Sequence, residues 1–308
     1  MAINTIEYAS VFQSELDKQM LEGATSGWME PNAALVKYNG GNEIKIPSIL
    51  MDGLADYDRD KGFVQGSVSL NWQTHQLTQD RGRTFSLDAN DVDETNFAAT
   101  AGIIMGEFQR TKVVPEIDAY RYSAIAALAM DGSRASGGYT PAESSILERL
   151  LRDIAIVQDV IGEGEQLVIT LPITVASILD NNEKIRKRMD VVDFKQGEIN
   201  LKVRGIDGHP IRPVPSARLK TAYLFQDGKT DGQTAGGFVE TVESKSINWL
   251  ITARTAPLAI SKTDVPRIFD PMTNQQANAW KIDYRKYHDL WIPKNKLPGV
   301  YANIKEDL

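Results

Sequence analysis

The spacing of apolar residues changes from helical to strand-like near the start of the chain. Residues 3–21 place apolar side chains at intervals of three to five, which predicts a short amphipathic helix on an N-terminal arm. Residues 63–72 and 77–87 alternate apolar with polar, and the acidic, glycine-flanked stretch 51–62 is typical of a hairpin tip. We therefore expect a long two-stranded ribbon, which is only marginally stable unless it lies on a neighbour.

A helical period follows the ribbon. Phe97, Ala101, Ile104 and Phe108 fall at intervals of four, three and four, which predicts one apolar stripe on a long helix. Pro115 is expected to kink or end this helix. The pattern then resumes through residues 117–128 and stops at the glycine-rich stretch 131–138.

A second helix is predicted between residues 140 and 162. Thr140 and Glu143 have the spacing of a capping box, Pro141 occupies the first helical position, and Gly162 follows the end. The apolar stripe between Leu147 and Ile161 is the clearest in the sequence and predicts a core-facing helix.

The rest of the chain alternates strands with exposed loops. A further helix, whole or broken, is indicated over 175–189 and ends in the basic run 184–188. Asp207-Gly208 favours a hairpin turn, and the glycine-rich stretch 226–237 favours a loop. Strands are predicted at 167–171, 199–203, 247–252, 258–262 and 280–292. Helices and strands are thus mixed along the chain, which indicates an α+β fold.

Composition narrows the class of protein. The chain has 308 residues, 42% of them hydrophobic and 24% charged, which suits one large domain or two ordinary ones. It has no cysteine, which excludes disulfides, thiol nucleophiles and cysteine-ligated metals. No export signal and no apolar run of about 18 residues is present, so we expect neither secretion nor membrane insertion.

Charge is distributed unevenly. The net charge is −7, which argues against a protein whose task is to bind phosphate backbones, because the surfaces that bind them are basic. Residues 1–92 carry 7 basic and 13 acidic side chains, while residues 181–220 carry 10 basic and 5 acidic ones. These regions could attract each other across a subunit boundary, although charged runs are usually solvated faces. The hypothetical intersubunit contact joins the acids Asp52, Asp56, Asp58 and Asp60 to the bases Lys184, Arg186, Lys187 and Arg188.

No catalytic, cofactor-binding or metal-ligating residue can be assigned. The three histidines lie far apart and have no partner at metal-ligand spacing. Residues 228–230 end like a phosphate-binding loop but lack its earlier glycine, and the acids at 88–94 lack the glycine of a calcium loop. The catalytic carboxylate pair of a glycosidase is defined by the distance between two side chains in space. The sequence alone therefore does not exclude such a pair.

Four segments, in this order, resemble the major capsid proteins of tailed bacteriophages, whose fold is shared with encapsulins and the herpesvirus capsid floor. Residues 77–95 resemble the returning strand of the extended loop, and residues 108–126 the end of the spine helix. Residues 203–219 are similar to the axial-domain hairpin, and residues 284–304 to the closing strand. The resemblance implies an N-terminal arm (1–42), an extended β-loop (43–92), a peripheral domain (93–131 and 241–308) and an axial domain (132–240).

The resemblance also implies a function. It predicts a non-enzymatic protein without cofactor that assembles into hexamers and pentamers of an icosahedral head around double-stranded DNA. The implied partners are other copies of the chain, a portal and a separate scaffolding protein, because the arm leads into the ribbon without a scaffolding block. The implied location is the virion, after assembly in the host cytoplasm. Two alternatives remain: an encapsulin-type nanocompartment shell, and a carbohydrate-active enzyme with two catalytic carboxylates in a deep pocket.

Overall fold

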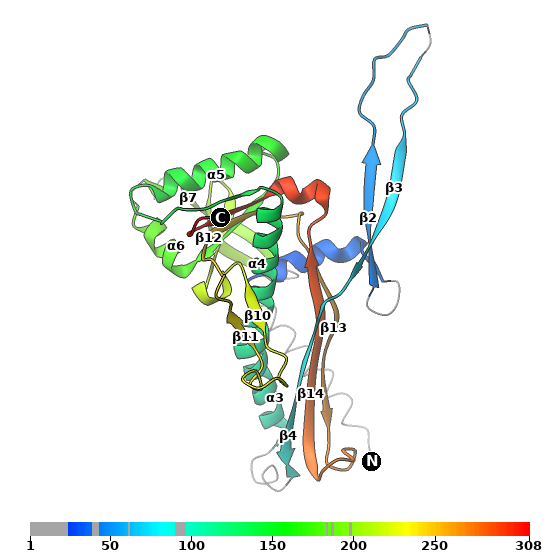
Figure 1. Cartoon of the computed structure of the whole chain (residues 1–308), viewed down its shortest axis with the longest axis vertical. Helices are drawn as coiled ribbons and strands as arrows, with labels where there is room; N and C mark the ends of the chain where they lie inside the picture. The colour runs from blue at the N-terminus through cyan, green and yellow to red at the C-terminus, as the bar shows by residue number, and fades with distance from the viewer. Residues whose placement is uncertain are drawn as a thin grey trace.

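The computed structural model describes residues 24–38, 43–60, 62–89, 97–182, 184–185, 188–196 and 199–308. The predicted arm helix at 3–21 lies outside these residues. Figure 1 shows three parts: a compact domain, a long helix beside a narrow sheet, and a two-stranded ribbon that projects away from both. The predicted α+β class is confirmed.

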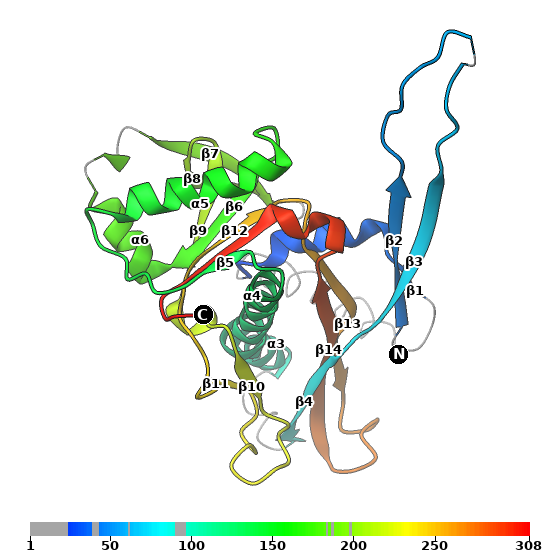
Figure 2. The same ribbon diagram turned by 45° about the horizontal axis from the view of Figure 1, so that its top comes forward.

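The compact domain is built on a seven-stranded sheet. In spatial order its strands are β5 (Ala135–Ser136), β15 (Val300–Ile304), β12 (Ile247–Ala253), β6 (Leu167–Pro172), β9 (His209–Val214), β8 (Ile199–Ile206) and β7 (Met189–Gln196). Every residue of β6, β12 and β15 is buried, so both faces of the sheet centre are covered. Helix α5 (Ile146–Ile161) lies across these strands, with α6 (Ile173–Asp180) beside it (Figure 2).

Helix α5 begins later than its sequence predicts. Ser145 is its N-cap, so the expected start after Thr140 is wrong. Glu143 does not close a capping box; its carboxylate and its carbonyl accept hydrogen bonds from Asn181 and Asn182 at the end of α6. Gly162 does end the helix, with φ of 85°.

The predicted long helix is continuous through Pro115. Helix α3 (Phe97–Phe108) passes through a π-helical turn, η2 (Gln109–Val113), into α4 (Val114–Asp131). Pro115 lacks an N–H and crowds the carbonyl four residues earlier, and the wide π turn accommodates both effects. We call α3, η2 and α4 together the spine helix.

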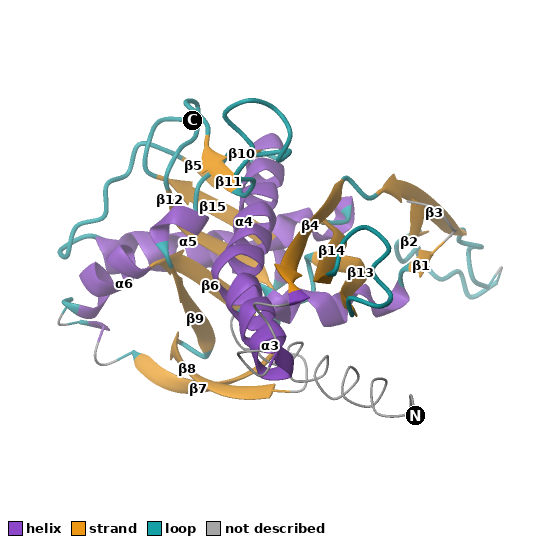
Figure 3. Cartoon of the chain, turned by 90° about the horizontal axis from the view of Figure 1, so that it is seen from below, coloured by secondary structure: helices purple, strands orange, loops and turns teal. Residues whose placement is uncertain are grey.

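A long three-stranded sheet runs beside the spine helix. It consists of β13 (Leu258–Phe269), β14 (Ala279–Trp291) and β4 (Gln79–Asp88), with β14 in the middle. Met105, Val113 and Ile117 of the helix pack on Ile282 and Tyr284 of β14. Seen from below, the sheet and the helix lie next to each other along their length (Figure 3).

The ribbon consists of β2 (Glu43–Met51) and β3 (Val68–Gln76), with β1 (Lys37–Tyr38) added at the root of β2. Strand β4 falls inside the predicted extended loop, 43–92, but pairs with β14 instead of the ribbon. The pairing of β2 with β3 places the end of the ribbon near residue 76. The division of the chain into four domains stays a prediction.

Short elements complete the fold. A small hairpin of β10 (Tyr223–Phe225) and β11 (Phe238–Glu240) carries the predicted loop at 226–237. Three 3-10 helices link the larger elements: η1 (Gly27–Leu35), η4 (Ser216–Arg218) and η5 (Lys294–Gly299). The predicted turn at Asp207-Gly208 is confirmed, since both residues have positive φ between β8 and β9.

Candidate assembly interface

The two faces of the ribbon differ in what they bury. Residues directly opposite each other in the ladder share a face, so Ile44 and Ile46 lie with His75 and Gln73 on one side. At the root this side packs against β13: Ile44 and Ile46 are 0% and 5% exposed, in a cluster with Leu258 and Ile260. The root of the ribbon is therefore part of the folded body.

Beyond the root, the opposite face of the ribbon is apolar and exposed. Met51 pairs with Val68, and Leu70 and Trp72 follow on the same face. Met51, Val68 and Leu70 are 72%, 70% and 54% exposed, and Trp72 is 37% exposed. Near the tip, Leu54, Tyr57, Phe63 and Val64 are also exposed. So many large apolar side chains on one projection indicate a surface that is covered by a partner.

The four predicted acidic residues lie along the outer ribbon, and all are exposed. Two of them also shape the tip. Asp52 accepts a hydrogen bond from the backbone N–H of Ser67 at 2.7 Å, and Asp58 accepts one from that of Asp60 at 2.8 Å.

Of the predicted basic partners, the two that the structure describes, Lys184 and Arg188, do not meet these acids within one chain. Lys184 and Arg188 lie between α6 and β7 in the sequence, and these two elements lie on the opposite side of the molecule from β2 and β3 (Figure 1). Arg188 forms an exposed ion pair with Asp207 at 3.3 Å. Arg186 and Lys187 lie outside the described residues. Contact between the two charged regions therefore requires a second copy, and the specific pairing stays a prediction.

A buried carboxylate holds the junction between the ribbon and the long sheet. Asp289 of β14 accepts hydrogen bonds from the N–H and the hydroxyl of Thr78, at 2.8 and 2.9 Å. Its other oxygen accepts the hydroxyl of Tyr120 on the spine helix at 2.5 Å. Burial, followed by this contact with Asp289, raises the pKa of Tyr120. The phenol is therefore protonated and donates.

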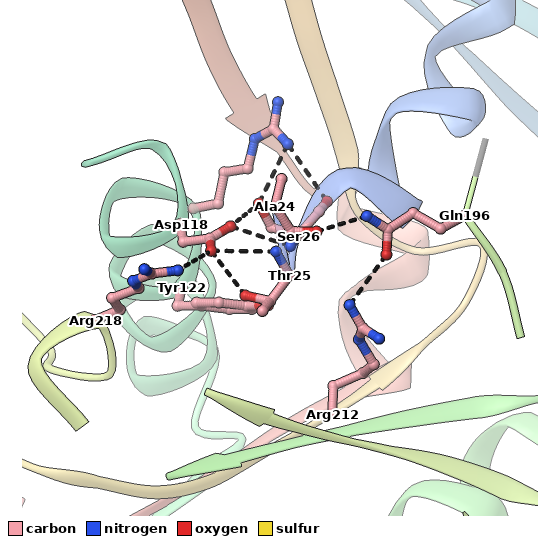
Figure 4. Close-up of polar contacts among 9 residues, drawn as sticks. Ala24, Thr25, Ser26, Asp118, Tyr122, Gln196, Arg212 and Arg218 are labelled. Carbon is pink, nitrogen blue, oxygen red and sulfur yellow. Dashed lines mark hydrogen bonds and ion pairs between the residues drawn. The ribbon is translucent and has the colours of Figure 1, made fainter. Parts of the chain in front are cut away.

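A second buried carboxylate anchors Thr25 and Ser26, which belong to the predicted N-terminal arm (1–42). Asp118 of the spine helix is fully buried. Its oxygens accept the backbone N–H groups of Thr25 and Ser26, at 3.2 and 3.0 Å, and their hydroxyls, at 2.8 and 2.6 Å. Arg218 of η4 forms an ion pair with it at 3.0 Å. Figure 4 shows Thr25 and Ser26 from one segment and Arg218 from another converging on this carboxylate of the spine helix.

Two further contacts extend this anchor to the compact domain. Gln196 of β7 donates to the carbonyl of Ala24 at 2.5 Å, and Arg212 of β9 donates to Gln196 at 3.1 Å (Figure 4). Arg121 of the spine helix forms an ion pair with Glu30 of η1 at 2.7 Å. These contacts therefore fix residues 24–30 between the spine helix and the seven-stranded sheet.

Sequence reasoning missed both Asp118 and Asp289. A usable signal exists for Asp118, which lies four residues after Val114 and four before Tyr122, on the buried side of the helix. Asp289 stands beside Leu290 near the end of an apolar strand pattern, where a polar residue is unexpected.

The described residues show no metal-ligand cluster and no membrane-spanning helix. Among them, no cluster of three or more His, Asp or Glu side chains could hold a metal ion. In the same part of the chain, no helix combines the length and the apolar character needed to cross a membrane.

Solved structures of phage capsids and of a virus-like particle have a similar arrangement of elements. The chain is similar to the capsid structure of cyanophage P-SCSP1u, with 9% identity and a TM-score of 0.57 over 88% of this chain and 86% of that one. It is similar to the capsid structure of Staphylococcus phage Andhra, with 12% identity and a TM-score of 0.53 over 87% and 82%. A virus-like particle from Pyrococcus furiosus matches over 97% of this chain and 100% of that one, with 9% identity and a TM-score of 0.50.

These similarities lie in the fold. No protein-family model matches the sequence, and no curated protein matches it. The structural matches span nearly the whole chain, so the predicted tailed-phage capsid fold is confirmed.

Proposed function

We propose that the chain is a major capsid protein that assembles with copies of itself into the icosahedral shell of a phage head. One observation carries the proposal: the root of the ribbon is buried against its own body, whereas beyond the root Met51, Val68, Leu70 and Trp72 form an exposed apolar face. The capsid fold of the structural relatives supports a second copy of the chain as the partner that covers this face.

The finer features of the proposal come from the resemblance of the sequence. The subunits form hexamers and pentamers, a separate scaffolding protein guides them, a portal occupies one vertex, and double-stranded DNA fills the shell. The shell is assembled in the host cytoplasm and remains in the virion. Catalysis has no part in this proposal.

Electron microscopy and analytical ultracentrifugation of the purified chain test the proposal. We expect capsomers or closed shells when the chain is concentrated or co-expressed with its neighbouring gene products. The matched variant replaces residues 52–67 with Asn-Gly, a turn that closes a hairpin. It should fold and stay monomeric, because the outer ribbon is missing. A parent chain that remains monomeric under every such condition would refute the proposal.

An encapsulin-type shell is a second candidate, favoured by the full-length match to the virus-like particle from Pyrococcus furiosus. The content of purified particles separates the two. A phage head holds double-stranded DNA after packaging, whereas a nanocompartment holds a cargo protein. Nuclease-protected DNA in particles from infected cells supports the first candidate, and a stoichiometric protein cargo supports the second.

A further inference from the structure

The ribbon leaves the body through a junction of two residues that belong to neither ladder. Pairing between β2 and β3 ends at Gln76, opposite Glu43. Pairing between β4 and β14 begins at Gln79, opposite His288. Leu77 and Thr78 lie between these points, so no ladder holds the place where the strand changes direction.

The side chain of Asp289 accepts a backbone hydrogen bond just beyond the last residue pair of the β4–β14 ladder. Asp289 follows His288, so it stands where the next partner of β4 would be, and its side chain receives the backbone N–H of Thr78 in place of a carbonyl. The hydroxyl of Thr78 donates to the same oxygen. Asp289 is 3% exposed, so water cannot substitute freely for these donors.

The other carboxylate oxygen connects the junction to the spine helix. It accepts the hydroxyl of Tyr120 in α4 and the backbone N–H of Leu290. Leu77, on the ribbon side, is 4% exposed in the cluster with Ile44 and Leu258, and its carbonyl accepts the hydroxyl of Tyr287 at 3.1 Å. The hydrogen bonds named here for Leu77 and Thr78 therefore come from β14, and β14 is tied in turn to the spine helix.

We propose that Asp289 is a positioning residue that fixes the direction in which the ribbon leaves the body and ties that direction to the spine helix through Tyr120. The consequence for assembly rests on the proposed function, since the ribbon must reach a second copy at a set angle. The geometric part concerns a single chain and does not depend on that function.

The absence of cysteine allows a direct measurement, because two introduced cysteines carry the only spin labels. Gln65→Cys at the outer ribbon and Asp159→Cys on α5 are both exposed positions. Labelled chains are diluted into unlabelled chains, so that pulsed electron paramagnetic resonance reports the distance within one chain. Asp289→Asn should widen the distance distribution about twofold, because an amide N–H₂ would face donors that need an acceptor.

Asp283→Asn is the matched control. Asp283 also lies on β14 and accepts a threonine hydroxyl of β4, that of Thr84, at 2.8 Å, but within the paired ladder. It should leave the distribution unchanged. If Asp289→Asn fails to fold, Thr78→Val removes only the hydroxyl donor and should widen the distribution less. An unchanged distribution in a folded Asp289→Asn or Thr78→Val chain would overturn the proposal.

Shell yield is measured in parallel. If the parent assembles, Asp289→Asn should lower the yield of shells and Asp283→Asn should not. If the parent forms no shells, the proposed function fails while the distance measurement still decides the role of Asp289.

Discussion

At the scale of single residues, buried carboxylates join segments that are far apart in the sequence. Burying an unpaired carboxylate costs several kcal/mol, so it persists only where enough donors surround it. Asp118 receives four hydrogen bonds from Thr25 and Ser26 and an ion pair from Arg218. Asp153 of α5 accepts the indole N–H of Trp249 and the amide of Asn303, although burial raises its pKa.

The contribution of Asp118 can be tested by Asp118→Asn. The variant leaves the guanidinium of Arg218 without its counter-ion and places an amide N–H₂ against donors. We expect the free energy of unfolding to fall by about 3 kcal/mol, as when one partner of a buried ion pair is removed. Urea denaturation measures it.

Asp180→Asn is the control for this prediction. Asp180 and Arg204 form an ion pair at 2.5 Å, but their side chains are 38% and 49% exposed. Its loss should cost less than about 1 kcal/mol. Equal losses in the two variants would contradict a special role for Asp118.

His288 gives the unfolding free energy a predictable dependence on pH. Its ring is 3% exposed, and burial together with the charges of Arg121, Lys286 and Arg81 holds its pKa well below the ordinary 6.5. Below pH 6.5 the unfolded chain takes up a proton that the folded chain does not. As the pH falls below 6.5, the free energy of unfolding should therefore decrease by about 1.4 kcal/mol per pH unit, until the pH reaches the pKa of His288 in the folded chain.

His288→Phe keeps a ring of similar size and removes the titration. Unfolding midpoints measured between about pH 7 and about pH 5, above the range of most carboxylates, should fall more gently in this variant than in the parent. Burial also lowers the pKa of His75 and His209, so some slope should remain. Parallel curves for parent and variant would show that His288 does not carry this dependence.

At the scale of elements, the ribbon should be the least protected strand pair in the unassembled subunit. The outer part of the ribbon is held by the pairing of β2 with β3 and packs on no hydrophobic cluster among the described residues. Strand β4, in contrast, pairs with β14 and packs against the spine helix. Hydrogen exchange should therefore be faster in β3 than in β4, although only Leu77 and Thr78 separate them. Protection in β3 equal to that of α5 in the monomer would contradict this expectation, and assembly should slow exchange in β3.

Hydrophobic periodicity predicted most elements, because a local pattern determines whether a segment buries one face as a helix or as a strand. It could not predict which strands pair. The alternation in 77–87 is the same whether β4 continues the ribbon or joins β14, and only the tertiary contacts decide. The start of α5 was missed for a similar reason: Glu143 bonds to the end of α6 instead of capping its own helix.

The exposed part of the candidate interface could be predicted, and the buried part could not. The acids of the outer ribbon follow from composition and turn chemistry, which are local. The anchors at Asp118 and Asp289 depend on residues about 92 and 211 positions away in the sequence. Single-sequence patterns carry no information on such distances.

At the scale of the whole molecule, the separation of charge favours contacts between copies. The acidic outer ribbon projects on one side, and α6 and β7, which flank Lys184 and Arg188, lie on the other (Figure 1). A ribbon lying across a neighbour should meet a basic surface, since like charges there would cost several kcal/mol. A single exposed ion pair contributes only about 0 to 1 kcal/mol, but every subunit of a closed shell repeats the contact.

Reversing Asp56, Asp58 and Asp60 together to lysine tests this electrostatic contribution to assembly. The subunit should remain folded, since these side chains are exposed and lie beyond the root of the ribbon. Shell formation at low salt should be impaired, and added salt should partly restore it by screening the new repulsion. Light scattering during assembly, followed by electron microscopy, measures both effects.

The triple asparagine variant separates charge from shape. Asparagine at 58 retains an oxygen that can accept the N–H of residue 60, so the turn at the tip is kept while the charge is removed. Assembly should be weakened less than in the lysine variant, and salt should restore it less, because there is no repulsion to screen. If instead the basic run faces packaged DNA or solvent, the lysine variant will assemble normally at low salt, and the ribbon then binds its neighbour through its apolar face alone.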